Sequence, residues 1–267
     1  MLKIVDILAE PIHEISYVNA KSGGGTESKR LELLRARVTG LDDRCRGIIV
    51  ASDLQGFSAS WYQPGGAVLL GNVLVEELEA LAYDGVIPAT KSLGVILAGD
   101  LYSIPGASKR GGFGDVSGVW STFADAFRWV VGVAGNHDHF GNANSQAKLM
   151  AQPNVHLLHG ETANVDGIRF GGVGYIAGNP RKPGRRSVQD QEAALDMVLE
   201  TEPEVLILHE GPRGGSKQRG DQQIRARIER SQTALTICGH RHWDVPLAGT
   251  STHQFLNTDS RALLLAS

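Results

Sequence analysis

The sequence has little cysteine and no long hydrophobic run. Only Cys45 and Cys238 are cysteines among its 267 residues, which excludes a disulfide framework and a cluster of thiolate metal ligands. No apolar run approaches the roughly 18 residues that cross a bilayer. Residues 1–10 mix apolar and charged side chains, so they lack the uncharged core of a signal peptide. We therefore expect a cytoplasmic protein with no membrane partner.

A large excess of charge of either sign is also absent. The chain has 26 Lys and Arg against 29 Asp and Glu, a formal net charge of −3. This balance excludes a globally basic protein that coats DNA, although local basic patches are compatible with it. No composition shift or linker divides the chain, so we expect a single domain over 1–267, with 1–45 as an N-terminal extension. The spacing of Leu31, Leu34 and Val38 predicts a helix over 27–38.

Glycine, in contrast, is abundant, and five short apolar runs end in polar side chains. The runs, at 47–52, 94–98, 129–134, 205–208 and 234–238, predict buried strands. Helical patterns lie between them, at 73–83, 119–126, 188–200 and 221–230, which favours an α/β fold. Since the carboxyl ends of parallel strands meet at one edge of a sheet, we expect the polar residues to share a site. They are Asp53, Asp100, Asn136, His209, His240 and His242.

These six side chains combine carboxylate, imidazole and amide donors without a thiolate. Such a mixed set suits Mn²⁺, Fe or Zn²⁺. It contains enough ligands for two ions, and a carboxylate can bridge them. The pattern is therefore typical of a two-metal hydrolytic site that acts on phosphate esters.

The order of these motifs resembles that of the calcineurin-like metallophosphoesterases, whose pattern is D-x-H, G-D, G-N-H-D/E, a lone H after a strand, and G-H-x-H. By typical residue usage, G-N-H-D alone would occur by chance in about one chain in a thousand of this length. The resemblance spans residues 53–242 and implies a four-layer αββα sandwich. The matching segments here are Asp53-Leu54-Gln55, Gly99-Asp100, Gly135-Asn136-His137-Asp138, Leu208-His209-Glu210 and Gly239-His240-Arg241-His242.

The resemblance also implies a ligand set for two divalent ions. The first ion would be held by Asp53 and His242, with Asp100 bridging to the second. The remaining ligands of the second ion would be Asn136, His209 and His240.

The resemblance further implies how the reaction proceeds. A hydroxide that bridges the two ions would attack the phosphorus atom. His137 would stabilise the phosphate oxygens or protonate the leaving alkoxide, and Asp138 would orient the His137 imidazole and favour its charged form.

Gln55 departs from the pattern, because the family has histidine at this position. A glutamine oxygen can bind a hard cation but is a weaker donor than imidazole, which favours Mn²⁺ over Zn²⁺ at the first site. Gln55 is therefore either a metal ligand or a group that hydrogen-bonds to a ligand, and the sequence leaves both readings open.

Two loops are basic and contain no acidic residue. The first loop is 179–186, and the second is 211–219, directly after the His209 motif. Arginine binds phosphate oxygens through its planar fork, so these loops predict an anion-binding rim, which Lys109 and Arg110 could join. The residues that we expect to bind substrate are Arg181, Arg185, Arg186 and Arg213.

The sequence therefore predicts a metal-dependent phosphoric ester hydrolase that acts on phosphodiesters or nucleotides, with a nucleic acid as an open alternative substrate. Three other functions compete with it. They are a phosphomonoesterase or protein phosphatase, a non-catalytic scaffold with a degenerate metal site, and a nucleic-acid-binding module that uses the arginine loops. The natural substrate and the oligomeric state are not encoded in these motifs.

Overall fold

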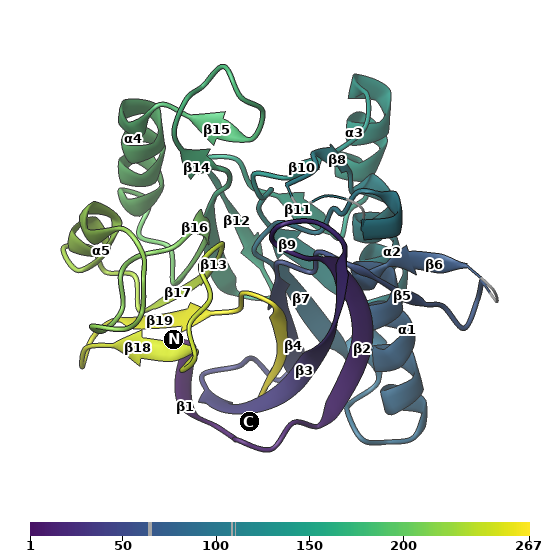
Figure 1. The fold of residues 1–267 in the computed structure, drawn as a ribbon. Coiled ribbons are helices and arrows are strands. Elements are labelled where there is room, and N and C mark those ends of the chain that lie inside the picture. The colour runs from purple at the N-terminus through teal and green to yellow at the C-terminus, as the bar shows by residue number, and fades with distance from the viewer. Residues whose placement is uncertain (64–65, 108, 110) are drawn as a thin grey trace.

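Two β-sheets lie face to face between two layers of helices (Figure 1). The computed structural model describes residues 1–63, 66–107, 109 and 111–267. Within this part of the chain, no helix combines the length and the apolar character that a membrane crossing requires. The arrangement confirms the expected four-layer αββα sandwich.

The first sheet has ten strands, ordered β11-β9-β7-β4-β20-β3-β2-β5-β6, with β1 also paired to β3. Its centre is buried on both faces, because β4 and β7 contain almost only apolar residues. Its strands are β1 (Lys3–Ile7), β2 (His13–Ala20), β3 (Thr26–Thr39), β4 (Gly47–Ser52), β5 (Phe57–Ala59), β6 (Ala67–Leu69), β7 (Leu93–Leu97), β9 (Trp129–Gly132), β11 (Val155–Leu157) and β20 (Arg261–Ala266).

The second sheet has six strands in the order β12-β13-β16-β17-β19-β18. Two short strand pairs, β8 with β10 and β14 with β15, belong to neither sheet. The strands of the second sheet are β12 (Glu161–Val165), β13 (Ile168–Val173), β16 (Val205–Glu210), β17 (Leu235–Gly239), β18 (Leu247–Gly249) and β19 (Gln254–Asn257). The short strands are β8 (Gly114–Asp115), β10 (Asp138–His139), β14 (Ile176–Ala177) and β15 (Arg185–Arg186).

Helices cover the outer face of each sheet (Figure 1). In the described residues, α1 (Leu70–Tyr83), α2 (Ser117–Ala126) and α3 (Ala143–Met150) lie on the side of the first sheet, and α4 (Val188–Leu199) and α5 (Gln222–Ile228) lie on the side of the second. The last two helices begin where a side chain caps them, because Ser187 and Asp221 accept hydrogen bonds from first-turn amides. The helices expected over 73–83, 119–126, 188–200 and 221–230 are confirmed within a few residues at each end.

The hydrophobic core is divided between the three gaps of the sandwich. The middle gap is filled from both sheets, and Trp129 of β9 packs against Phe170 of β13 with ring centroids 5.6 Å apart. Asp166, in the turn between β12 and β13, ties the same two sheets by accepting hydrogen bonds from Arg128 and from the Trp129 indole. The two sheets are thereby held in a defined relative position at this end.

The helix expected over 27–38 was wrong, because these residues form most of β3. Leu31 and Leu33 face the core under the helices, whereas Leu34 and Val38 face the core between the sheets. Because the buried face changes between Leu33 and Leu34, the apolar residues at 31, 34 and 38 imitate a helical period. Strands β1 to β3 all pair within the ten-stranded sheet, so the first 45 residues are built into the sandwich.

Candidate metal centre

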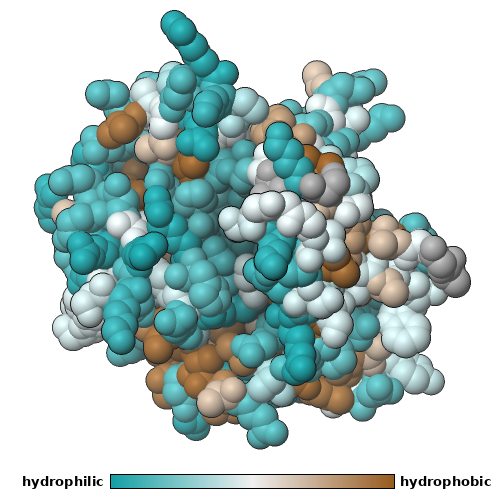
Figure 2. Space-filling view, viewed as in Figure 1, coloured by the Kyte–Doolittle hydropathy of each residue, from teal (hydrophilic) through white to brown (hydrophobic). Residues whose placement is uncertain are grey.

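The polar residues that follow five strands gather where the carboxyl ends of these strands meet. Strands β4, β7 and β9 run parallel in the first sheet, and β16 and β17 run parallel in the second. Hydrophilic side chains cover the middle of the face shown in Figure 2, which is hollowed between the two halves of the molecule. The expected convergence of the motifs on one site is therefore present in the structure.

The site is close-packed because two glycines allow two loops to touch. Gly99 has a φ of 90°, and a Cβ there would overlap the backbone of Gly135. A Cβ on Gly135 would in turn overlap the Asp100 carboxylate. The glycines of the G-D and G-N-H-D motifs are thus required for the approach of the loops after β7 and β9.

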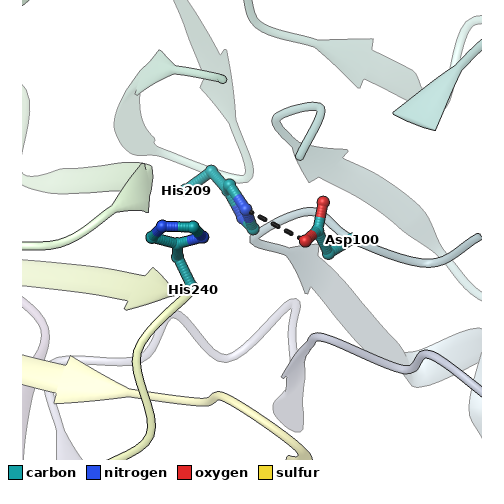
Figure 3. Close-up of side chains that lie close together, drawn as sticks. All are labelled: Asp100, His209 and His240. Atoms are coloured by element: carbon teal, nitrogen blue, oxygen red, sulfur yellow. Dashed lines mark ion pairs between the residues drawn. The ribbon is translucent and has the colours of Figure 1, made fainter. Parts of the chain in front are cut away.

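Three motif residues form a compact group of potential metal ligands (Figure 3). One ligand atom from each of Asp100, His209 and His240 lies within 4.8 Å of the other two. The Nε2 atom of His209 is 3.4 Å from Oδ2 of Asp100 and 3.1 Å from Oδ1 of Asn136. We call Asp100, Asn136, His209 and His240 the metal cluster.

His209 is oriented by its second ring nitrogen. Its side chain is fully buried, and Nδ1 lies 2.8 Å from the carbonyl oxygen of Ala98. A carbonyl can only accept, so Nδ1 carries a proton, and Nε2 is the ring nitrogen that faces the cluster. This is the arrangement by which proteins commonly fix a metal-binding histidine.

Burial and neighbouring charges shift the pKa values of the two cluster histidines in opposite directions. Burial lowers the pKa of His209, but the Asp100 carboxylate raises it more, to a net value of about 10. Burial and the positive charge of His209 lower the pKa of His240 to about 4. In the absence of a cation, the cluster therefore retains a proton between Asp100 and His209, and metal binding would release it.

Several buried carboxylates also lie at the site. Asp100 is 2% exposed, Asp138 is fully buried, and Asp53 is 9% exposed. Burial and the nearby Asp259 raise the pKa of Asp53 well above its usual value. Because buried anions are costly without a compensating charge, this set of donors fits a bound divalent cation.

Asp138 has a different partner from the one expected. Its carboxylate accepts hydrogen bonds from the backbone N–H groups of Asp100, Leu101, Tyr102 and Gly135. Among the described residues, it makes no hydrogen bond to the His137 ring. A carboxylate satisfied by four amides stabilises the two loops and thereby positions Asp100 and Asn136.

His137 is oriented by a backbone group instead. Its Nδ1 atom lies 2.6 Å from the carbonyl oxygen of Gly112. Its Nε2 atom lies 3.7 Å from Oδ2 of Asp100, and the side chain is 23% exposed. His137 therefore presents Nε2 at the border between the metal cluster and solvent.

The residues expected for the first metal ion are arranged differently. Asp53 has a φ of 53°, and its Oδ2 accepts a hydrogen bond from the backbone N–H of His240. The Gln55 amide donates to Oδ2 of Asp100 at 3.1 Å, so Gln55 makes the hydrogen bond that the sequence had left open as one alternative. His242 lies outside the metal cluster, with its side chain 51% exposed.

The loop 179–186 lies directly beside the metal cluster. A Cβ on Gly184 would overlap the backbone of Asn136, so this loop touches the segment that carries one cluster residue. Arg185 and Arg186 are half-buried, and neither guanidinium forms an ion pair with a described residue. Arg186 contacts His159 through Nη2 at 2.9 Å and lies over the Tyr175 ring.

The remaining basic residues that the sequence predicted to bind substrate make no described contact with the metal cluster. Arg181 and Arg213 are exposed, and neither side chain contacts a cluster residue in the described part of the chain. Lys109 is exposed, whereas Arg110 lies outside the described residues.

Sequence reasoning missed Asp259, Arg261 and two backbone carbonyls. Asp259 and Arg261 follow β19 and contact His242. The pattern that identified the other motifs, a polar residue after an apolar run, could have indicated Asp259. No sequence signal marks the carbonyl groups of Ala98 and Gly112, because every residue has one.

Comparison with known proteins agrees with this geometry. The model of the calcineurin-like phosphoesterase family matches residues 47–244, and this protein belongs to that family. No curated protein matches the chain significantly.

Solved structures resemble the chain at low sequence identity. The protein TT1561 of Thermus thermophilus has a TM-score of 0.54 and 16% identity, over 81% of this chain and 90% of its own. A novel archaeal phosphodiesterase has a TM-score of 0.35 and 14% identity, over 79% of this chain and 82% of its own. At these identities, the likeness to TT1561 supports the fold.

Proposed function

We propose that this protein hydrolyses phosphoric esters with a divalent ion bound by Asp100, Asn136, His209 and His240. The observation that carries the proposal is the buried metal cluster, in which carboxylate, amide and imidazole donors converge. Two of its four ligand side chains offer oxygen, which favours a hard ion such as Mn²⁺, with Fe and Zn²⁺ as alternatives.

The residues present fit such an ion. The carbonyl of Ala98 orients His209 so that Nε2 faces the cluster, where it would bind the ion after losing its proton. The Asp100 loop is held by Asp138. When bound, a divalent ion would polarise a phosphoryl oxygen and lower the pKa of water in its shell.

His137 supplies the protein's own proton chemistry in this proposal. Its Nδ1–H is held by Gly112, so Nε2 is free to face a substrate at the border of the cluster. There the doubly protonated imidazolium would donate a hydrogen bond from Nε2 to a phosphate oxygen, or transfer that proton to the leaving oxygen and become the neutral ring that is protonated on Nδ1. Arg185 would bind a further phosphate oxygen from the adjacent loop.

We infer a phosphodiester or nucleotide as the substrate, because a diester carries less negative charge than a monoester. Arg185 and Arg186 of the adjacent loop are both half-buried, and Arg186 already contacts His159. Among the described residues, the guanidinium of Arg185 has no hydrogen-bond partner, so one arginine of this loop is available to a phosphate oxygen. A phosphomonoesterase or protein phosphatase would need more positive charge to hold a dianion.

The test is turnover of bis-p-nitrophenyl phosphate and p-nitrophenyl phosphate by the purified protein with Mn²⁺, Fe²⁺ or Zn²⁺. We expect faster turnover of the diester, highest with Mn²⁺, and loss of activity with a chelator. Faster turnover of the monoester would favour the phosphomonoesterase. A folded protein that binds metal but hydrolyses neither ester nor a nucleotide panel would be a non-catalytic scaffold.

Matched histidine variants make the test specific. His240→Ala should reduce turnover by about 10²-fold or more, because it removes a metal ligand. His156→Ala is the control, since this histidine lies on β11 and makes no side-chain hydrogen bond to a described residue. Equal activities of the two variants would contradict the assignment of the metal cluster.

A further inference from the structure

The final strand of the chain brings a buried arginine to the metal centre. Arg261 is the first residue of β20 and pairs in register with Ser52, the residue before Asp53. Its side chain is only 6% exposed. The pairing of β20 with β4 therefore places a permanent positive charge next to the residues expected to hold a first metal ion.

The guanidinium of Arg261 donates a hydrogen bond to Nε2 of His242, and a metal ion would need the lone pair of that nitrogen. Nη2 of Arg261 lies 3.2 Å from Nε2 of His242 and donates to the carbonyl oxygen of Trp243 at 2.9 Å. Guanidinium has no acceptor and stays protonated in proteins. Nε2 of His242 must therefore be the acceptor in this contact.

The other ring nitrogen of His242 is engaged as well. Nδ1 lies 3.2 Å from the carbonyl oxygen of Asp259 and 3.5 Å from its carboxylate Oδ1. Both of these atoms are acceptors, so Nδ1 carries the proton. With Nδ1 protonated and Nε2 bound to Arg261, neither nitrogen of His242 is available to a metal ion.

The remaining residues of the expected first site do not compensate for this loss. The Gln55 amide directs its NH₂ group toward Asp100, where a ligand would direct oxygen. Asp53 already accepts a hydrogen bond through Oδ2 from the N–H of His240. Without His242, and with these two side chains engaged in other contacts, an ion there would be left with few donors.

We propose that this protein holds one tightly bound divalent ion, and that Arg261 prevents a second by occupying His242. The inference rests on the proposed function, because it takes the metal cluster as the site of the one ion. Arg261 thus positions His242 away from the metal centre.

Metal counting tests this without any measurement of turnover. The purified protein is freed of metal, dialysed against Mn²⁺, and measured for bound metal and for the dissociation constant by calorimetry. We expect about one tightly bound ion per chain in the wild type. Two tightly bound ions would overturn the inference, whereas no bound ion would refute the proposed metal cluster itself.

Two histidine variants from the same motif provide a matched comparison. His242→Ala truncates a half-exposed side chain, and we expect the same amount of bound Mn²⁺ as in the wild type. His240→Ala should weaken binding by about 10–100-fold or more, because it removes a cluster ligand. Loss of a bound ion, or tenfold weaker binding, in His242→Ala would show that His242 is a ligand and would overturn the inference.

A third variant tests the role of Arg261 directly. Arg261→Met keeps a long, unbranched side chain but removes the N–H groups that donate to His242. Nε2 of His242 is then free, and a second Mn²⁺ should bind at least about tenfold more tightly than in the wild type. Unchanged binding of a second ion in a folded variant would show that Arg261 does not block the site. If this variant does not fold, His242→Ala still decides whether His242 is a ligand.

Discussion

The carboxylate of Asp138 accepts a hydrogen bond from the backbone N–H of Asp100 at 2.7 Å. A buried acid outside the metal cluster thus holds the loop of an acid inside it. The same carboxylate accepts from Gly135 on the neighbouring loop. Asp138 therefore connects the G-D and G-N-H-D motifs through the backbone.

Asp138→Asn should weaken both the fold and the activity. Asparagine replaces one acceptor oxygen with a donor, so two of the four amides lose their partner. We expect a loss of about 2–4 kcal/mol in the free energy of unfolding, measured by urea denaturation. Asp84→Asn, at an exposed position, is the control, and equal stability of the two variants would contradict the role assigned to Asp138.

His137→Ala should lower kcat by about 10²-fold or more, because it removes one positioned acid or hydrogen-bond donor. The amount of bound Mn²⁺ should be unchanged, since His137 is held by Gly112 and lies at the border of the cluster. Steady-state kinetics and metal analysis on the same preparation check both parts. A variant that lost its metal would show that His137 is a ligand.

Arg185→Ala should raise KM by about tenfold or more, as expected for the loss of one charge-assisted hydrogen bond to phosphate. Lys182→Ala is the matched control, because Lys182 is exposed on the same loop. Kinetics on bis-p-nitrophenyl phosphate measure the difference. Similar KM values for both variants would mean that the loop contributes only general positive charge.

Asp166→Ala should destabilise the contact between the two sheets by about 1–3 kcal/mol at neutral pH. Its side chain accepts from Arg128 and Trp129, and the hydrogen bond from Arg128 is the main cause of its lowered pKa.

The lowered pKa also sets the pH dependence of this effect. A carboxyl group whose pKa is lowered in the folded state contributes its full stability at pH values above its unfolded pKa of 3.8. This contribution is lost as the pH falls from 3.8 through the lower pKa of the folded state. The difference between wild type and Asp166→Ala should therefore shrink below pH 3.8, as followed by urea denaturation. Asp43→Ala, at an exposed position, is the control, and a difference that grew in acid would contradict this account.

Much of the fold could be predicted where local pattern and tertiary environment agree. The runs that became β4, β7 and β16 are apolar throughout, because both faces of these strands are covered. In β3, the buried face changes along the strand, and the local pattern was misread as a helix. The spacing of apolar residues in a sequence does not show whether a side chain packs under the helices or between the two sheets.

The order of motifs and the apolar runs before them predicted the αββα fold and the convergence of polar residues from several strand ends, since short-range pattern encodes strands and strand ends. Only the tertiary structure decided the partners of the motif side chains. Asp138 contacts backbone amides, Gln55 donates to Asp100, and His242 meets Arg261. These contacts depend on backbone N–H groups and on a strand, β20, that returns from the far end of the chain. Hydrogen bonds between residues so distant in sequence leave no periodic trace in it.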